Sequence, residues 1–239
     1  MDTEATSVAN EPSTLAAGPR AMPAVRALMA EAAGTYTMVL IGTGSVVVDA
    51  AAGGRLTQWG IGFGFFVAVA LPIFLFGKAS GAHVNPAVTI AFVVLGRFPA
   101  AWLVPYWLAQ LMGGIAASAT LWVAVGALGD LGATVPSGTA GESLLVEAAI
   151  SYILMFAIAY VTGVVRPSHT MTALLIGGTV GAIAAFAGPI SGASMNPART
   201  LGPAVATGIF THHWVYWAGP IAGTCLGALA FRVLARRTG

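Results

Sequence analysis

The tripeptide Asn-Pro-Ala occurs twice in this sequence, and its residue types give the clearest indication of a chemical role. Each copy follows small polar residues and opens a short apolar run, in SGAHVNPAVTIAF and in SGASMNPARTLG. Asparagine is a favoured helix N-cap, and proline suits the first helical position because its missing N–H would have no partner there. We therefore predict that two short helices begin at these boxes, which comprise Asn85, Pro86 and Ala87, and Asn196, Pro197 and Ala198.

Three charged residues stand within otherwise apolar sequence. Glu31 and Glu147 lie inside hydrophobic stretches, and Arg199 follows the second box directly. Charges in such surroundings are costly and mark functional positions by default. Taken alone, the glutamates could relay protons, whereas the guanidinium would offer donors to oxygen atoms and repel cations.

The elements that must position these groups are membrane-spanning helices. The chain is 57% hydrophobic and 8% charged, whereas a soluble domain carries about 25% charged residues. A hydrocarbon core of roughly 30 Å needs about 20 apolar residues per helix. Windows of this kind indicate an all-α membrane protein with six spans, at about residues 25–48, 59–76, 102–124, 144–164, 171–188 and 214–234.

The chain also contains an internal repeat. AEAAGTYTMVL around Glu31 matches VEAAISYILMF around Glu147, the two boxes follow in the same order, and a Tyr-Trp pair occurs in the third and sixth windows. The repeats cover about residues 24–125 and 142–235. Each holds three spans, so the second enters the membrane from the opposite side. Inverted repeats with interrupted helices point to a binding or conduction site near the bilayer midplane.

The interruptions are the two boxes, whose apolar runs of about 10 residues would be roughly 15 Å long. Each run covers half of the bilayer, and inversion makes the two half-helices meet by their N-termini. These ends would place about +0.5 charge each at the centre, beside the amide donors of Asn85 and Asn196. We expect this centre to repel cations and to interrupt the hydrogen-bonded water chain that protons need.

Charge distribution predicts the topology. With six spans both termini share one side, and the positive-inside rule makes that side cytoplasmic. We interpret residues 1–22 as a disordered cytoplasmic tail and residues 23–235 as a channel domain. Only Arg55 and Arg199 fall on the far side, and the basic residues on the near side are Arg20, Arg26, Lys78, Arg97, Arg166, Arg232, Arg236 and Arg237.

Two Asn-Pro-Ala boxes on inverted three-helix repeats, with arginine after the second, resemble the aquaporin (major intrinsic protein) family over nearly all of residues 24–235. SGAHVNPAVTIAF, GRFPAAW, PYWLAQ and GPISGASMNPARTLGPA most resemble the nodulin-26-like subgroup and its bacterial relatives. The resemblance implies six transmembrane helices plus two re-entrant half-helices. It also implies a homotetramer with one passive pore per subunit, without enzymatic activity or cofactor. That subgroup is associated with glycerol and metalloid acids as well as water.

The resemblance also implies a selectivity filter of four side chains, here Phe65, Ala184, Ala193 and Arg199. Water-selective members usually carry histidine where this chain has Ala184, so we expect a wider aperture with one apolar wall. Phe66 follows where the family often has glycine, and either ring could face the pore. Thr200 stands where glycerol-specialised members have aspartate, which disfavours dedicated glycerol uptake.

Three further roles follow from the resemblance. Glu31 and Glu147 would each hold a re-entrant loop by accepting hydrogen bonds from its backbone. His83, before the first box, would line the pore or bond its own loop, in a structural role.

The predicted function is a passive channel in the cell (plasma or inner) membrane for water and small uncharged solutes, such as glycerol or metalloid acids, that excludes ions and protons. The alternatives are an inverted-repeat secondary transporter, a strictly water-selective channel and a structural membrane protein with a closed pore. The predicted partners are the lipid bilayer, the solutes and further copies of the chain. No spacing of residues indicates an enzyme, a metal site or a nucleic-acid surface.

Overall fold

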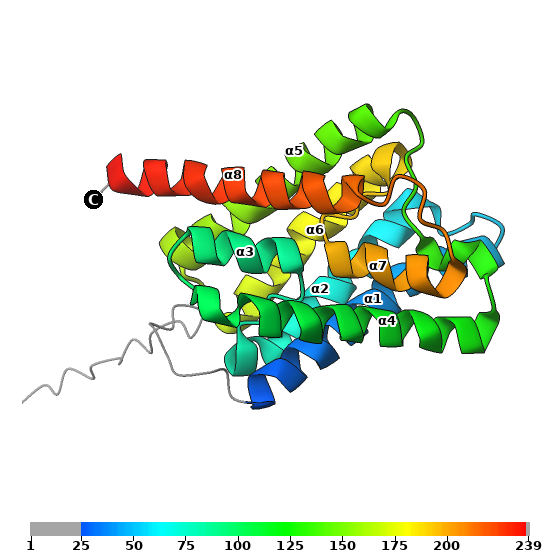
Figure 1. The fold of residues 1–239 in the computed structure, drawn as a ribbon, viewed down its shortest axis with the longest axis horizontal. Coiled ribbons are helices and arrows are strands. Elements are labelled where there is room, and N and C mark those ends of the chain that lie inside the picture. The colour runs from blue at the N-terminus through cyan, green and yellow to red at the C-terminus, as the bar shows by residue number, and fades with distance from the viewer. Residues whose placement is uncertain (1–24, 238–239) are drawn as a thin grey trace, which may run out of the picture.

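The six predicted spans are present as long helices in the computed structural model, which describes residues 25–237 (Figure 1). Short helical turns η1 (Ala100–Trp102), η2 (Leu128–Gly132) and η3 (Val161–Val165) lie between or extend them. The predicted tail, residues 1–22, lies outside the described residues. The long helices are α1 (Val25–Ala51), α2 (Thr57–Ser80), α4 (Leu103–Val125), α5 (Ala140–Tyr160), α6 (His169–Ser191) and α8 (Val215–Arg237).

Two half-helices, α3 (Pro86–Val94) and α7 (Pro197–Thr207), complete the fold. Both begin at the proline of an Asn-Pro-Ala box, which confirms the predicted start. The Asn85 side chain caps α3 by accepting a hydrogen bond from the backbone N–H of Ala87 at 2.8 Å. Asn196 caps α7 by accepting from Ala198 at 2.9 Å. Each tip is therefore stabilised by a side chain of its own box.

The two halves interlock across the molecule (Figure 1). Within the halves α1 packs on α4 and α5 on α8, while α2 and α6 pack on each other between them. Each half-helix packs on a long helix of the other half: α7 packs on α4, and α3 packs on α8. A hydrogen bond from Thr224 Oγ1 on α8 to the carbonyl of Ala87 at 2.8 Å ties the second contact. Each half therefore covers the re-entrant helix of the other.

The fourth span begins earlier than its apolar run predicts. The sequence window starts near residue 144, whereas α5 starts at Ala140. The reason is a capping box: the backbone N–H of Glu142 donates to Thr139 Oγ1 at 3.2 Å, and Glu142 Oε2 accepts from the backbone N–H of Thr139 at 2.8 Å. Paired caps of this kind begin helices in polar sequence, where hydropathy gives no signal.

Glycines allow matched helix pairs to approach closely. A Cβ atom on Gly113 of α4 would lie 2.2 Å from the carbonyl oxygen of Ala32 on α1, and one on Gly223 of α8 would lie 2.1 Å from that of Ala148 on α5. A backbone carbonyl cannot move aside as a flexible side chain can. Glycine is therefore required at both contacts, as small residues are where membrane helices pack tightly.

We expect Gly223→Ala to lower the free energy of unfolding by about 1–3 kcal/mol, the usual cost of overpacking a tight contact. Unfolding in detergent micelles, followed by circular dichroism, measures the change. Gly178→Ala on α6 is the matched control, because a Cβ atom there would meet no atom within 4 Å. Equal stability of the two variants would contradict the packing argument.

Candidate pore and selectivity filter

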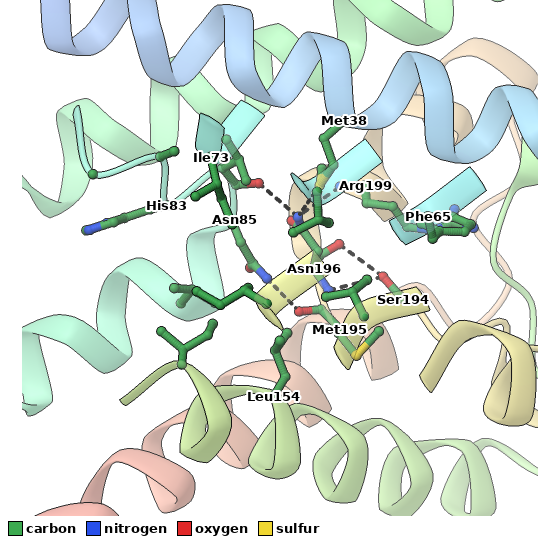
Figure 2. Close-up of a pocket in the computed structure, with 18 of the residues that line it drawn as sticks. Met38, Phe65, Ile73, His83, Asn85, Leu154, Ser194, Met195, Asn196 and Arg199 are labelled. Atoms are coloured by element: carbon green, nitrogen blue, oxygen red, sulfur yellow. Dashed lines mark hydrogen bonds between the residues drawn. The ribbon is translucent and has the colours of Figure 1, made fainter. Parts of the chain in front are cut away.

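A cavity passes between the tips of the two half-helices (Figure 2). Its walls come from α1, α2, α5, η3 and α6, and from both half-helices with the loops that precede them. Asn85 and Asn196 lie at its centre, with His83 toward one end and Arg199 and Phe65 toward the other. The sequence boxes therefore meet at one place, as inversion of the repeats requires.

The two asparagine amides each use one N–H to bond the opposite loop. Asn85 Nδ2 donates to the carbonyl of Met195 at 2.8 Å, and Asn196 Nδ2 donates to that of Val84 at 2.9 Å. Each NH₂ group has two donors. The second N–H of Asn196 faces only the sulfur of Met38, a weak acceptor, at 3.4 Å. Because both amide oxygens cap helices, the asparagines act only as donors toward a molecule in the cavity.

Glu31 holds the first loop. Its Oε1 accepts from Ser80 Oγ at 2.7 Å and from the backbone N–H of His83 at 2.9 Å. Its Oε2 accepts from the backbone N–H of Val84 at 2.8 Å and from Gln110 Nε2 at 2.7 Å. A carboxylate offers about four lone-pair sites, so these four donors satisfy a buried charge that would otherwise be expensive in a membrane.

Glu147 holds the second loop in the same way. Its Oε1 accepts from Ser191 Oγ at 2.8 Å and from the backbone N–H of Ser194 at 2.9 Å, and its Oε2 accepts from that of Met195 at 2.8 Å. Both loops carry residues with left-handed backbone at matched positions, including Val84 with φ 44° and Met195 with φ 53°. Such conformations cost of order 1–3 kcal/mol each, and the carboxylate bonds offset that cost.

His83 is linked to Glu31 through two further side chains. Gln110 Nε2 also donates to Thr89 Oγ1 at 2.9 Å, and Thr89 Oγ1 lies 2.9 Å from the carbonyl of Asn85 and 3.2 Å from His83 Nδ1. The single hydroxyl hydrogen goes to the nearer carbonyl, so the imidazole must donate from Nδ1. His83 Nε2 is then left as an acceptor on a ring that lines the cavity.

Sequence reasoning missed Gln110 and Thr89. The signal for Gln110 was a polar residue inside the third apolar window, where it needs a buried partner. Thr89 stands one helical turn after Asn85, so its hydroxyl shares a face with the N-cap.

We expect ¹⁵N NMR of histidine-labelled protein in lipid vesicles to show His83 protonated at Nδ1 and free at Nε2 near neutral pH. Thr89→Val removes the acceptor while keeping the side-chain shape, and should shift His83 toward the Nε2–H tautomer. The His83→Phe variant assigns the signal, since it removes that resonance alone. An Nε2–H tautomer in the unmodified protein would overturn this donor assignment.

The buried guanidinium of Arg199 has one protein acceptor that fixes its place. Arg199 is 4% exposed, and its Nη1 donates to the carbonyl of Gly132 at 2.6 Å. That carbonyl follows a left-handed backbone turn, with φ of 59°, 48° and 51° at Gly129, Asp130 and Leu131. Arg199 Nε has no partner among the described residues. Arg199 lines the cavity, so the Nη hydrogens of its guanidinium that do not bond Gly132 are donors for an oxygen atom there.

Phe65, rather than Phe66, faces this arginine. Arg199 Cζ lies 5.3 Å from the centre of the Phe65 ring, and both side chains line the cavity. Gly42 of α1 makes room, because a Cβ atom there would lie 2.6 Å from Phe65 Cε1. The Cβ of Phe66 instead packs against Gly181 of α6. In this structure Phe65 therefore forms the cation–π pair with Arg199, and Phe66 packs on α6.

The two predicted alanines differ in position. Ala193 lines the cavity beside Arg199, whereas Ala184 is buried on α6 without being part of the cavity wall. Val180, one turn earlier on α6, does line the cavity. The side chain of Ala184 is a single methyl group, and the cavity wall on α6 is formed by Ile176 and Val180.

Comparison with known proteins identifies the family of the chain. The family model described as major intrinsic protein matches residues 19–231. The chain belongs to the major intrinsic protein family. Aquaporin NIP1-1 of Zea mays is 39% identical over 214 residues, covering 89% of this chain and 76% of that protein. A probable aquaporin NIP-type of Nicotiana alata is 43% identical over 208 residues, covering 87% and 77%.

A solved structure, the aquaglyceroporin from Plasmodium falciparum, has the same fold. The TM-score is 0.83 at 22% sequence identity, over 90% of this chain and 98% of that one. The predicted fold class, with six spans and two half-helices in an inverted repeat, is confirmed. Family membership also makes this multi-pass membrane protein a channel for water and small solutes, and not an enzyme.

Proposed function

We propose that this channel conducts water together with small uncharged hydroxylated solutes, such as glycerol or the hydroxy acids of boron and arsenic. The observation that carries the proposal is the Phe65 ring set 5.3 Å from the Arg199 guanidinium, with alanine at 184 and 193. Such a filter offers hydrogen-bond donors on one side and an apolar wall on the other. A solute with hydroxyls on one face and carbon on the other suits both walls.

Exclusion of ions and protons is part of the same proposal. The half-helix N-termini, the Asn85 and Asn196 donors and the Arg199 charge all favour lone pairs over cations at the cavity. Water that accepts from both asparagines cannot also pass a proton along a continuous wire. The proposal places the Arg199 end outside the cell and both termini in the cytoplasm, because most basic residues then lie inside.

A coupled transporter fits the contacts poorly. Ion coupling through a carboxylate would need aspartate or glutamate in the cavity, yet the residues that line it in the described chain include neither. His83 does line it, with its Nδ1 bonded to Thr89. Glu31 and Glu147 are both engaged in holding the loops. Downhill flux that is independent of proton and sodium gradients is therefore expected.

Ala184→His tests the width of the filter in liposomes, with light scattering after an osmotic step. We expect the unmodified protein to pass water and glycerol, and the variant to lose about tenfold or more of its glycerol permeability while still passing water, because pore diameter sets solute selectivity. A pH-sensitive dye inside the vesicles should report no proton entry with either protein. Ala185→Ser on the same helix is the control, since Ala185 packs against Gly62 of α2.

If the unmodified protein passes water but not glycerol, the channel is strictly water-selective and the Phe65 ring closes the aperture. If it passes neither while circular dichroism shows folded protein, the closed-pore alternative is correct.

We further propose a homotetramer with one pore per subunit, as the family resemblance implies. Native mass spectrometry from detergent micelles should give a mass of four chains. A predominant monomer that still conducts in vesicles would contradict the tetramer while leaving the pore assignment intact.

A further inference from the structure

Three arginines from separate segments lie at the end of the molecule opposite Arg199. Arg232 of α8 donates from Nη1 to the carbonyl of Val94 at the end of α3, at 2.8 Å. Arg97, shortly after α3, donates from Nη1 to Thr162 Oγ1 at 3.3 Å, and its Cζ lies 5.1 Å from the ring centre of Phe231. Figure 1 shows α3 beside the C-terminal half of α8 at this end.

Arg166, between η3 and α6, lies beside Gly163 together with Arg97. Its Nε donates to the carbonyl of Gly163 at 2.9 Å. On the other side of this glycine a Cβ atom would lie 2.5 Å from Arg97 Nη2. Burial and, second, the charge of Arg166 lower the pKa of Arg97. Guanidinium groups nonetheless stay charged at neutral pH, so the protein holds like charges close together.

No carboxylate offsets these charges within the described part of the chain. Glu31 and Glu147 are buried and bonded to the loops. The other described acids lie at the far ends of the helices: Asp49 near the end of α1, Asp130 in η2 and Glu142 in the first turn of α5. The arginine group is therefore short of an anion.

The backbone that places Arg166 is itself strained. The chain makes a π-helical turn at η3, where the N–H of Arg166 bonds the carbonyl of Val161 at 2.8 Å. Arg166 then adopts left-handed backbone, with φ 46° and ψ 52°, directly before Pro167. Both features are costly for ordinary residues and cluster at functional sites. Here they turn the Arg166 side chain back onto Gly163, beside Arg97.

Exposed valines stand next to two of these arginines in the sequence. Val164, Val165 and Val233 are 54%, 50% and 55% exposed, and they belong to the same segments as the arginines. In a membrane such residues face acyl chains. A ligand that suits this place has an anionic head for the guanidiniums and hydrocarbon for the valines, a combination that free phosphate lacks.

We propose that Arg97, Arg166 and Arg232 bind the phosphate of an anionic phospholipid whose acyl chains lie along these valines. The planar guanidinium matches phosphate oxygens in paired hydrogen bonds. Thr162, the Arg97 partner, lines the cavity. The bound head group therefore lies next to the mouth of the pore, although binding does not depend on what the pore conducts.

The test measures lipid binding to the full-length protein in detergent micelles by native mass spectrometry, with phosphatidylglycerol or phosphatidylcholine. We expect phosphatidylglycerol to bind more tightly than phosphatidylcholine. Arg166→Gln and Arg232→Gln should each weaken its binding about fivefold, because a basic residue near an anionic membrane surface contributes about 1 kcal/mol. Both variants should keep their water permeability in vesicles, which shows that they fold.

Two further variants separate a built site from diffuse attraction. Gly163→Ala keeps every charge but takes the space beside Arg97 Nη2, so it should also weaken phosphatidylglycerol binding. Arg26→Gln removes one charge from α1, which packs on α2 and α4, and should leave binding unchanged. Equal weakening by Arg26→Gln and Arg166→Gln would overturn the proposal. Inorganic phosphate that displaces the lipid at equal concentration would replace the lipid with free phosphate as the ligand.

Discussion

The bonds from two buried carboxylates to two loops are the interaction on which the rest of the structure depends. A half-helix can begin at the membrane midplane only if the irregular backbone before it is buried in protein or lines a water-filled cavity. Glu31 and Glu147 each accept hydrogen bonds from two consecutive backbone N–H groups of such a loop. The helix tips, the asparagine donors and Arg199 all take their positions from loops held in this way.

The two halves use this device with different supporting side chains. In the first half Gln110 bonds both Glu31 and Thr89, and His83 completes the chain. In the second half Ser194 replaces the histidine and bonds Thr200 directly. The first half thus presents an acceptor at one end of the cavity. The second half presents Arg199, a cationic donor, at the other end. The two ends of the cavity therefore differ in charge and in hydrogen-bonding character, although the backbone of the two halves repeats.

Much of the fold could be predicted from the sequence. The hydropathy windows show which segments lie in lipid, and the duplicated boxes show where the two half-helices begin. The start of α5 could not be predicted from hydropathy, because the capping box of Thr139 and Glu142 that begins this helix lies in polar sequence. The site was harder to predict. Which phenylalanine faces Arg199 depends on the rotation of α2 against Gly42 and Gly181, and the acceptor at Gly132 depends on a left-handed turn. Both features are determined only when segments that are distant in the sequence pack together.

The crossed packing of the half-helices has a consequence for biosynthesis. α3 packs on α8, which is synthesised after every other described helix, and the carbonyl of Met195 that receives the Asn85 amide belongs to the second loop. When the first half inserts, its re-entrant segment therefore still lacks the packing and hydrogen-bond partners that the second half supplies. A gene encoding one half alone would yield a chain that needs a second copy, inserted upside down, before it could enclose a channel.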